Sequence, residues 1–390
     1  MNYEIIRRVF LIFGTTFLFS LCITPVVKKI AKHVGALDIP NERKVHKVPM
    51  PRLGGLSIFF GFLLGYMLFG EQSIVMNSVL IASFVVIIIG VFDDIKPLPA
   101  SIKFIGQFIA ACIIVFYGNI VLQDVSAFGI YIDFGIFAIP FTLFFILGCI
   151  NCMNLIDGLD GLAAGISSIY FATIGIIAIM QGKFGLDFIL TFIMLGSTMG
   201  FLVHNFNPAT IFMGDSGSMF LGLIISVIAL LGFKNVTMTS FIIPLLLLAI
   251  PILDTIFAII RRTLKGEKIS TPDKYHIHHQ LLKRNLTQRQ TVIAIYIMNI
   301  LFAFASIVYV LKDPELGYII YGVLLVIVLV FIVKTDVIYD SSNIRKKFKK
   351  KILKIEDQEE EKKKKSKNKD KTKKTKKNKK KKYFFFLIIF

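Results

Sequence analysis

The sequence predicts an all-α polytopic membrane protein with about eleven transmembrane helices and a disordered basic C-terminal tail. Of its 390 residues, 55% are hydrophobic, and the mean hydropathy is +0.73. Many apolar runs approach the roughly 20 residues that a helix needs to cross a bilayer. The polar residues gather in short clusters between these runs, and the basic residues gather at the C-terminus.

Eleven apolar runs are the candidates for the transmembrane helices. The first follows Arg7 and Arg8, as in a signal peptide, but no cleavage signature of small residues precedes Lys28, so we expect a retained first span. After the fourth run, residues 118–134 alternate weakly between apolar and polar and predict a short extracytoplasmic hairpin. The expected spans are 9–27, 53–70, 76–92, 102–117, 135–150, 162–180, 187–203, 218–233, 239–260, 291–311 and 316–333.

The formal net charge of +20 is concentrated at one end of the chain. Residues 341–390 contain 22 Lys and Arg against 6 Asp and Glu, or +16. Such a low-complexity run cannot bury a core. We therefore expect an integral membrane domain at 1–340 and a disordered cytoplasmic tail at 341–390. The tail is either simply solvated or attracted to anionic lipid, at roughly 1 kcal/mol per lysine near the surface; no nucleic-acid partner is expected.

The charges of the loops predict the orientation. If the tail is cytoplasmic, so are loops 28–52 and 261–290, which carry seven and eight Lys and Arg. After the N-terminus, the loops on the other side carry only Lys183, Lys234 and Lys312, as the positive-inside rule requires. We expect a multi-pass protein of the plasma (inner) membrane with its N-terminus outside. Every polar cluster then falls on the cytoplasmic face.

Four polar residues recur at every third position after the fifth run, namely Asn151, Asn154, Asp157 and Asp160. A centrally placed Asp costs roughly 2.5–3.5 kcal/mol on insertion scales, so a cluster near the bilayer indicates function by default. A three-residue step drifts by about 60° on a helix, so the four share a face only if the helix breaks, which the glycines of the motif allow. Helix capping is the alternative for any one of them.

Two further acidic clusters flank spans. Asp93 and Asp94 end the third run, and their mutual repulsion is offset when a cation lies between them or one is protonated; an ordinary turn is the alternative. Asp215 precedes the eighth run as a candidate N-cap. The glycines at 214 and 217 also let a metal and backbone amides approach a phosphate closely.

The last cytoplasmic loop combines basic residues with histidines. His276, His278 and His279 follow Arg261 and Arg262. A zinc site is one interpretation, but catalytic zinc usually has ligands on firm secondary structure. Beside so many cations, the histidines fit hydrogen-bond donors to a phosphorylated ligand better.

Together, these clusters predict an active site for Mg²⁺ and a diphosphate on the cytoplasmic face. Carboxylate oxygens hold Mg²⁺ without a dedicated cage, and substrate phosphates complete its coordination. A transporter is the remote alternative, but its acids would lie deep within spans. The six aspartates of this face are 93, 94, 157, 160, 215 and 273.

Four motifs in this order resemble the polyprenyl-phosphate N-acetylhexosamine-1-phosphate transferases of glycosyltransferase family 4. These membrane enzymes start wall teichoic acid, enterobacterial common antigen and the O-antigen of lipopolysaccharide. The resemblance covers about residues 28–282. The motifs are D-D-x-x-x-L with a following K-F-x-x-Q, N-x-x-N-x-x-D-G-L-D-G-L, N-F-x-P-A-x-I-F-M-G-D-x-G-S, and P-D-K-x-H-x-H-H.

The resemblance implies transfer of N-acetylglucosamine 1-phosphate, or a related sugar phosphate, from a UDP-N-acetylhexosamine to undecaprenyl phosphate, with release of UMP. It also implies Mg²⁺, with Mn²⁺ as a substitute, and allows an oligomer. The alternative is the sister group that acts on UDP-N-acetylmuramoyl-pentapeptide. That group usually carries three consecutive histidines, whereas His-Ile-His-His resembles the N-acetylglucosamine branch.

Matching positions imply the site residues. Asp215 is the expected principal Mg²⁺ ligand, with Asp93 or Asp94 beside it. The other aspartate of that pair is expected to orient or deprotonate the lipid phosphate. Lys103 is expected to bind the negative charge of this phosphate. Phe212 is expected to stack near uracil. The other expected substrate-binding residues are Asn151, Asn154, Asp157 and Asp160 at the nucleotide, and Arg261, Arg262, His276, His278 and His279 at the sugar and diphosphate.

Overall fold

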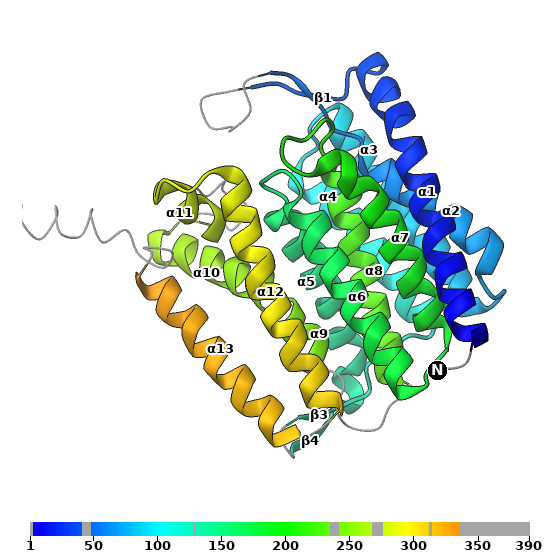
Figure 1. Cartoon of the computed structure of the whole chain (residues 1–390), viewed down its shortest axis with the longest axis vertical. Coiled ribbons are helices and arrows are strands. Elements are labelled where there is room, and N and C mark those ends of the chain that lie inside the picture. The colour runs from blue at the N-terminus through cyan, green and yellow to red at the C-terminus, as the bar shows by residue number, and fades with distance from the viewer. Residues whose placement is uncertain are drawn as a thin grey trace, which may run out of the picture. The chain divides into compact units, whose positions relative to one another are not determined.

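The computed structural model describes residues 3–40, 48–127, 130–234, 242–266, 276–311 and 314–334, most of them helical (Figure 1). Contacts divide the chain into two units, Met1–Ile338 and Tyr339–Phe390. The second unit, and with it the predicted disordered tail, lies outside the described residues. The helices are α1 (Tyr3–His33), α2 (Gly55–Phe69), α3 (Ile74–Ile95), α4 (Ala100–Cys112), α5 (Ala138–Ile156), α6 (Leu162–Gln181), α7 (Leu186–Asn205), α8 (Gly214–Lys234), α9 (Ile242–Leu247), α10 (Ala249–Lys265), α11 (Ile277–Lys283), α12 (Gln288–Leu311) and α13 (Pro314–Lys334).

The predicted class, an all-α polytopic membrane protein, is confirmed. Within the described residues, eight helices are long and apolar enough to cross a membrane. Two shorter apolar helices accompany them, α2 and residues Glu315–Val330 of α13. A π-helix, Ile113–Tyr117, prolongs α4, and a 3₁₀ helix, Gly135–Phe137, precedes α5.

The span expected at 239–260 is not one continuous helix in the described part. It is divided at Leu248 into α9 and α10. Pro251 lacks the N–H that would bond to the carbonyl of Leu247, so the helical hydrogen-bond pattern is interrupted there. In Figure 1, α10 runs across the direction of α12. The bend brings Asp254, on α10, to the N-terminal end of α11.

Two β-hairpins interrupt the helices. Strands β3 (Asp124–Ala127) and β4 (Ile130–Asp133) pair antiparallel, which confirms the hairpin predicted from weak alternation. Strands β1 (Leu37–Asp38) and β2 (Met50–Pro51) form a second antiparallel pair that was not predicted, because two-residue strands leave no periodic pattern.

Several helices extend beyond the apolar runs that indicated them. α3 continues through Asp93 and Asp94, α5 continues through Asn154, and α8 begins at Gly214. Hydropathy marks the part of a helix that lies in the hydrocarbon layer and not the end of the helix. The backbone hydrogen bonds of a helix can continue through polar residues once the chain leaves the bilayer. The helix is interrupted between Ile156 and Leu162, as predicted, and Gly161 adopts a left-handed φ of 79°.

Helix α8 lies inside the bundle, packed against α3 and α5, while α7 packs against α1 and α6. Glycines allow the N-terminal turn of α8 to approach its neighbours. A methyl group on Gly55 of α2 would overlap the backbone nitrogen of Gly217, and one on Gly90 of α3 would overlap Cα of Ser216. These close contacts fix the position of the first turn of α8, which carries Asp215.

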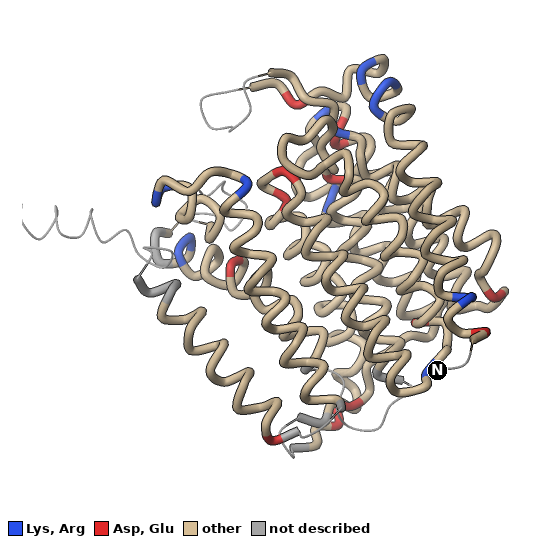
Figure 2. Tube along the Cα trace, in the orientation of Figure 1, with Lys and Arg blue, Asp and Glu red and all other residues tan. Residues whose placement is uncertain are grey.

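The polar clusters gather at one end of the bundle. Figure 2 shows acidic and basic positions concentrated near β1 and the adjoining loops, at the end of α1 opposite the N-terminus. The β3–β4 hairpin lies at the other end (Figure 1). The expectation that the clusters share one face is therefore met, whereas the cytoplasmic assignment of that face stays a prediction.

Gly55→Ala is expected to destabilise the fold. The added methyl group would meet backbone atoms of Gly217, which cannot move away as a side chain can, and such overpacking costs roughly 1–3 kcal/mol. The thermal unfolding midpoint in detergent should fall. Gly148→Ala is the matched control, because nothing lies within 4 Å of the new methyl group; equal midpoints for the two variants would contradict this packing.

Candidate active site

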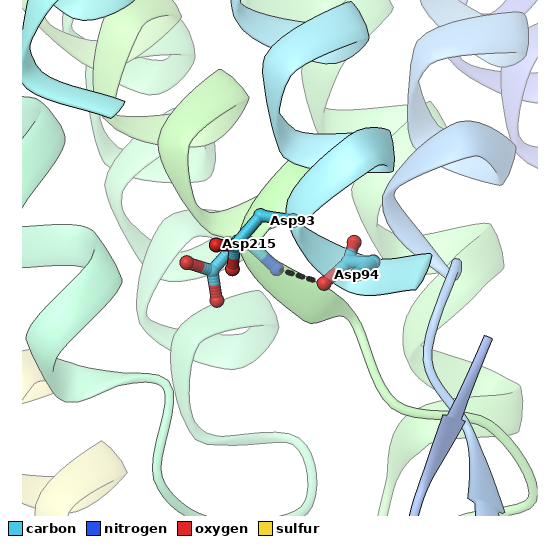
Figure 3. A group of neighbouring side chains, drawn as sticks. All are labelled: Asp93, Asp94 and Asp215. Carbon is cyan, nitrogen blue, oxygen red and sulfur yellow. Dashed lines mark hydrogen bonds between the residues drawn. The ribbon is translucent and has the colours of Figure 1, made fainter. Parts of the chain in front are cut away.

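Three carboxylates meet where α3 and α8 converge. Asp93 and Asp94 come from the last turn of α3, and Asp215 comes from the first turn of α8 (Figure 3). One oxygen from each lies within 4.8 Å of the others. Three hard oxygen donors at this separation fit Mg²⁺ or Mn²⁺, which prefer carboxylate ligands. The geometry therefore suits the predicted metal.

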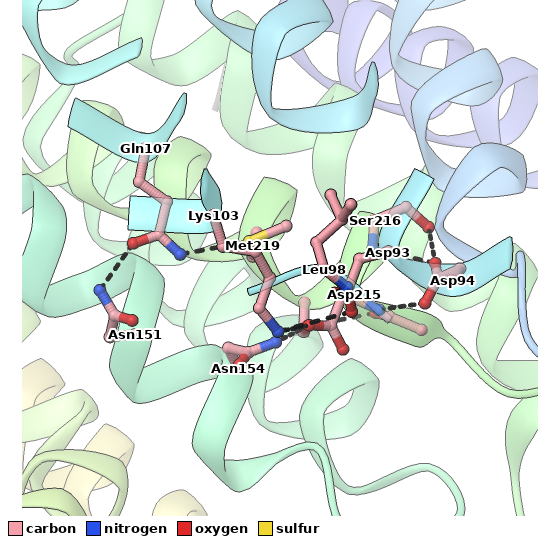
Figure 4. A network of polar contacts seen from close by, with 12 residues as sticks. Asp93, Asp94, Leu98, Lys103, Gln107, Asn151, Asn154, Asp215, Ser216 and Met219 are labelled. Carbon is pink, nitrogen blue, oxygen red and sulfur yellow. Dashed lines mark hydrogen bonds and ion pairs between the residues drawn. The ribbon is translucent and has the colours of Figure 1, made fainter. Parts of the chain in front are cut away.

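Asp94 accepts hydrogen bonds on both carboxylate oxygens. Its Oδ1 accepts from the backbone N–H of Asp215 at 2.8 Å, and its Oδ2 accepts from Ser216 through the backbone N–H at 3.1 Å and Oγ at 2.7 Å (Figure 4). The Nε of Arg52 lies 3.1 Å from Oδ1. Asp94 thus caps the N-terminus of α8 from a neighbouring helix, the position where a negative charge stabilises a helix.

Asp93 has fewer partners. Its Oδ1 accepts the backbone N–H of Leu98 at 2.8 Å, which closes the turn after α3. Its Oδ2 lies 3.4 Å from Nζ of Lys103. This oxygen faces the cluster, so Asp93 is better placed than Asp94 to bind a cation or meet a phosphate.

Two cations hold Asp215. Nζ of Lys103 lies 2.8 Å from Oδ2, and an Nη nitrogen of Arg52 lies 2.9 Å from Oδ1. Burial by itself would lower the pKa of Arg52, but the nearby carboxylates, Asp94 and Asp215 first among them, raise it, so the guanidinium stays charged. The role of Arg52 could not be predicted from the sequence, because a single arginine in a basic loop carries no distinctive pattern.

A cavity of about 440 Å³ opens beside the cluster. Asp215 and Arg52 line it, so the acidic cluster forms part of its wall. Five predicted substrate-binding residues also line it: Asn154, Asp157, Asp160, Phe212 and His279. A cavity of this size, with a few convergent polar groups, is typical of a small-molecule site.

The two aspartates of the α5–α6 break differ. Asp160 accepts hydrogen bonds from the side chain of Asn207 at 2.9 Å and the backbone of Ala209 at 3.1 Å, so it joins this loop to the one before α8. At Asp157, burial and then the charge of Asp215 raise the pKa to about 8. Asp157 therefore holds its proton closer to neutral pH than an ordinary aspartate does, and in its protonated form the hydroxyl can donate to a ligand carbonyl.

The amides of the motif occupy different places. Asn154 donates to Oγ of Ser218 at 3.0 Å and lines the cavity. Asn151, one turn earlier, donates to Oε1 of Gln107 at 2.9 Å and is not among the described cavity-lining residues (Figure 4). The structure thus brings Asn154 to the cavity and gives Asn151 a contact between α4 and α5.

The three histidines lie together but in unequal environments. His279 lines the cavity. His278 is buried beside Gly158, and burial, with the neighbouring His279, lowers its pKa to about 3, so it is neutral at pH 7. Nδ1 of His276 donates to Asp254 at 2.7 Å. Only His279 of the three is placed on the cavity wall; His276 and His278 pack behind it.

Asp254 was missed by the motif search. Besides His276, it accepts the backbone N–H of Ile277 at 2.8 Å, so it caps α11 and orients the histidine segment. Asp254 lies in an apolar run that predicts an ordinary transmembrane span. An aspartate within such a run is itself an indication of a functional residue. Arg261 and Arg262 are buried on α10 and are not among the described cavity-lining residues.

Comparison with known proteins agrees with these motifs. A sequence model of glycosyl transferase family 4 matches residues 76–233. The chain is 41% identical over 350 residues, 89% of this chain and 98% of the relative, to a probable undecaprenyl-phosphate N-acetylglucosaminyl 1-phosphate transferase of Bacillus subtilis (strain 168).

More distant relatives share the same type of description. A decaprenyl-phosphate N-acetylglucosaminephosphotransferase of Mycolicibacterium smegmatis is 32% identical over 83% of this chain and 88% of the relative. An undecaprenyl-phosphate alpha-N-acetylglucosaminyl 1-phosphate transferase of Haemophilus influenzae is 33% identical over 72% and 81%. The chain therefore belongs to glycosyl transferase family 4, the polyprenyl-phosphate N-acetylhexosamine-1-phosphate transferases that its four motifs resemble.

Proposed function

We propose that the protein transfers N-acetylglucosamine 1-phosphate from UDP-N-acetylglucosamine to undecaprenyl phosphate and releases UMP. The observation that carries this proposal is the juxtaposition of an acidic cluster, two half-buried cations and a polar cavity at one end of a membrane bundle. An acceptor anchored in lipid requires a site at the bilayer surface. The relatives named above support the sugar and the lipid.

The reaction brings together groups that repel each other. The lipid phosphate and the donor diphosphate carry about three to four negative charges, so catalysis needs positioning and cations more than a protein nucleophile. Bound by Asp215 and Asp93, Mg²⁺ would neutralise developing charge on the phosphates; Mn²⁺ is the substitute. Asp94 fixes the N-terminus of α8, and with it Asp215, in the position that this arrangement needs.

The two cations divide the site into a donor side and an acceptor side. Arg52 lines the cavity, whereas Lys103 is not among its described lining residues and approaches Asp215 from α4. The donor therefore occupies the cavity, with Arg52 at its diphosphate and Phe212 against uracil. The lipid phosphate lies at Lys103 and Asp93. A lipid phosphate oxygen bonds to the β-phosphorus, and the bond from that phosphorus to the bridging oxygen breaks as UMP leaves.

The direct test is release of UMP by purified protein in lipid nanodiscs with Mg²⁺. UMP should appear only when UDP-N-acetylglucosamine and undecaprenyl phosphate are both present. Asp124→Asn, which changes an acid in the β3–β4 hairpin, is the control and should retain activity. No UMP from folded protein across a panel of UDP-sugars would refute the proposal.

A competition assay separates the two branches of the family. The relatives' names favour N-acetylglucosamine over the muramoyl-pentapeptide donor. Unlabelled UDP-N-acetylglucosamine should suppress transfer of the labelled sugar, while UDP-N-acetylmuramoyl-pentapeptide at the same concentration should not. Transport receives little support, because the acids of the cluster lie at one end of the bundle (Figure 2).

Donor binding is expected to weaken as pH rises from 7 to 9. The pKa of Asp157 is raised to about 8, so this range ionises it and adds a negative charge to a cavity that receives a diphosphate. The donor KM should rise by roughly three- to tenfold. In Asp157→Asn, where position 157 stays neutral, KM should change little with pH. The same rise in both proteins would contradict this assignment.

Asp254→Asn is expected to raise the donor KM by roughly tenfold with a smaller effect on kcat. A carboxamide keeps an oxygen for the N–H of Ile277 but presents an NH₂ group to Nδ1 of His276, so position 254 no longer accepts the hydrogen bond from His276. The α11 segment then loses one of its two bonds to α10, and His279 shifts from its position on the cavity wall. Steady-state kinetics at varied donor concentration measure the effect. An equal loss in kcat at unchanged KM would contradict a positioning role.

A further inference from the structure

Arg52 joins carboxylates from three separate elements. Its guanidinium lies 3.8 Å from Asp38 on β1, 3.1 Å from Asp94 on α3 and 2.9 Å from Asp215 on α8. The fork of an arginine suits this arrangement because its nitrogens donate in fixed, divergent directions. One side chain therefore links the β1–β2 hairpin to both halves of the acidic cluster.

The backbone around Arg52 is firmly held. Its N–H donates to the carbonyl of Ala36 at 3.0 Å, and Pro51 accepts the N–H of Phe212 at 2.8 Å. The N–H of Gly54 in turn donates to the carbonyl of Phe212 at 2.9 Å. Because both flanks are fixed to the cavity wall, any rearrangement of Arg52 is confined to its long side chain, which is 24% exposed.

The guanidinium and the proposed metal need the same carboxylate. Arg52 donates to Oδ1 of Asp215, one of the three carboxylates whose oxygens gather within 4.8 Å of one another. A divalent cation at that place would lie within a few ångströms of a fixed positive charge, and their repulsion lowers the affinity for the metal. Arg52 also lines the cavity, so a diphosphate entering there offers oxygens that a guanidinium binds as well as it binds a carboxylate.

We propose that Arg52 is an exchangeable counter-ion that makes metal binding depend on the donor. Without donor, Arg52 neutralises Asp215 and Asp94. When the donor enters, the guanidinium turns to its diphosphate and leaves the Asp215 carboxylate to the metal. Lys103 does not make this exchange with the donor, because the described cavity wall does not include it. This inference rests on the proposed function, namely a metal at Asp215 and a donor in the cavity.

Binding of Mn²⁺ to the full chain in nanodiscs tests the proposal without turnover. The electron paramagnetic resonance signal of free Mn²⁺ is measured first with no substrate and then with UDP-N-acetylglucosamine but no lipid acceptor. In the unaltered protein the donor should tighten Mn²⁺ binding by roughly tenfold. In Arg52→Gln, Mn²⁺ alone should bind roughly tenfold more tightly than in the unaltered protein, because a nearby positive charge is gone. The donor should then tighten Mn²⁺ binding by clearly less than in the unaltered protein, because its phosphates still complete the coordination of the metal but no longer draw a guanidinium away from Asp215.

Two further variants make the outcomes separable. Asp215→Asn should lose Mn²⁺ binding, and retained binding would refute the metal site of the proposed function. If Asp215→Asn loses binding but Arg52→Gln binds Mn²⁺ no more tightly than the unaltered protein, the counter-ion role is overturned while the proposed function stands.

Arg52→Lys covers the case in which the glutamine variant does not fold. A single ammonium keeps the charge but cannot bridge Asp94 and Asp215 as the guanidinium does. Mn²⁺ alone should bind within about threefold of the unaltered protein, and the donor-induced gain should fall from roughly tenfold to about twofold. An unchanged tenfold gain would overturn the proposal.

Discussion

Asp215→Asn is expected to reduce UMP release by roughly a thousandfold or more. The two carboxylate oxygens of Asp215 contact Lys103 and Arg52, and a carboxamide replaces one of them with an NH₂ group that faces a cation. Loss of a charged ligand removes several kcal/mol of charge stabilisation from a metal-assisted reaction. The initial rate of UMP release, measured over a range of Mg²⁺ concentrations, gives the effect.

The fold of Asp215→Asn should survive, because its two cations keep other partners. Lys103 still faces Asp93, and Arg52 still faces Asp94. The thermal unfolding midpoint should therefore remain close to that of the unaltered protein. Near-normal activity at saturating Mg²⁺ would contradict the ligand role of Asp215.

Asp94→Asn and Asp93→Asn are both expected to lose activity, but for different reasons. Asp94 accepts from two backbone N–H groups and a hydroxyl and also contacts Arg52, so the amide leaves buried donors unpaired at a cost of roughly 3 kcal/mol. Asp93→Asn keeps an oxygen for the N–H of Leu98 and loses mainly its charge. Both variants should lose activity, but only Asp94→Asn should lose stability.

Thermal unfolding beside UMP release distinguishes the two aspartates. The midpoint should fall clearly for Asp94→Asn and stay within about 2 °C for Asp93→Asn. Asp94 would then be a positioning residue for α8, and Asp93 a residue that meets the metal or the lipid phosphate. Equal midpoints for both variants would overturn this division of roles.

The sequence predicted the fold class because crossing a bilayer imposes a strong pattern on composition and length. It also predicted that the acidic clusters share one face, since loops that follow successive spans alternate sides. The α5–α6 break was predicted from its glycines, and Gly161 indeed adopts a positive φ. These features depend on local chemistry, which a sequence displays directly.

The division of labour among neighbouring residues could not be predicted, because it depends on contacts between distant segments. Asp93 and Asp94 are adjacent in sequence, yet only Asp94 caps α8. The packing of Gly217 against Gly55 is a contact between distant segments that the motif around Asp215 does not display. His276 and His279 differ because the bend between α9 and α10 delivers Asp254 to one of them.

The fate of the β-phosphate tests the central claim most directly. UDP-N-acetylglucosamine labelled with ³²P at the β-position is incubated with the protein, undecaprenyl phosphate and Mg²⁺, and the lipid and aqueous fractions are separated. Transfer of a sugar 1-phosphate predicts that the label moves into the lipid fraction, in step with unlabelled UMP in the aqueous fraction. Label that leaves with UDP while the sugar enters the lipid would contradict it, because the enzyme would then transfer the sugar alone.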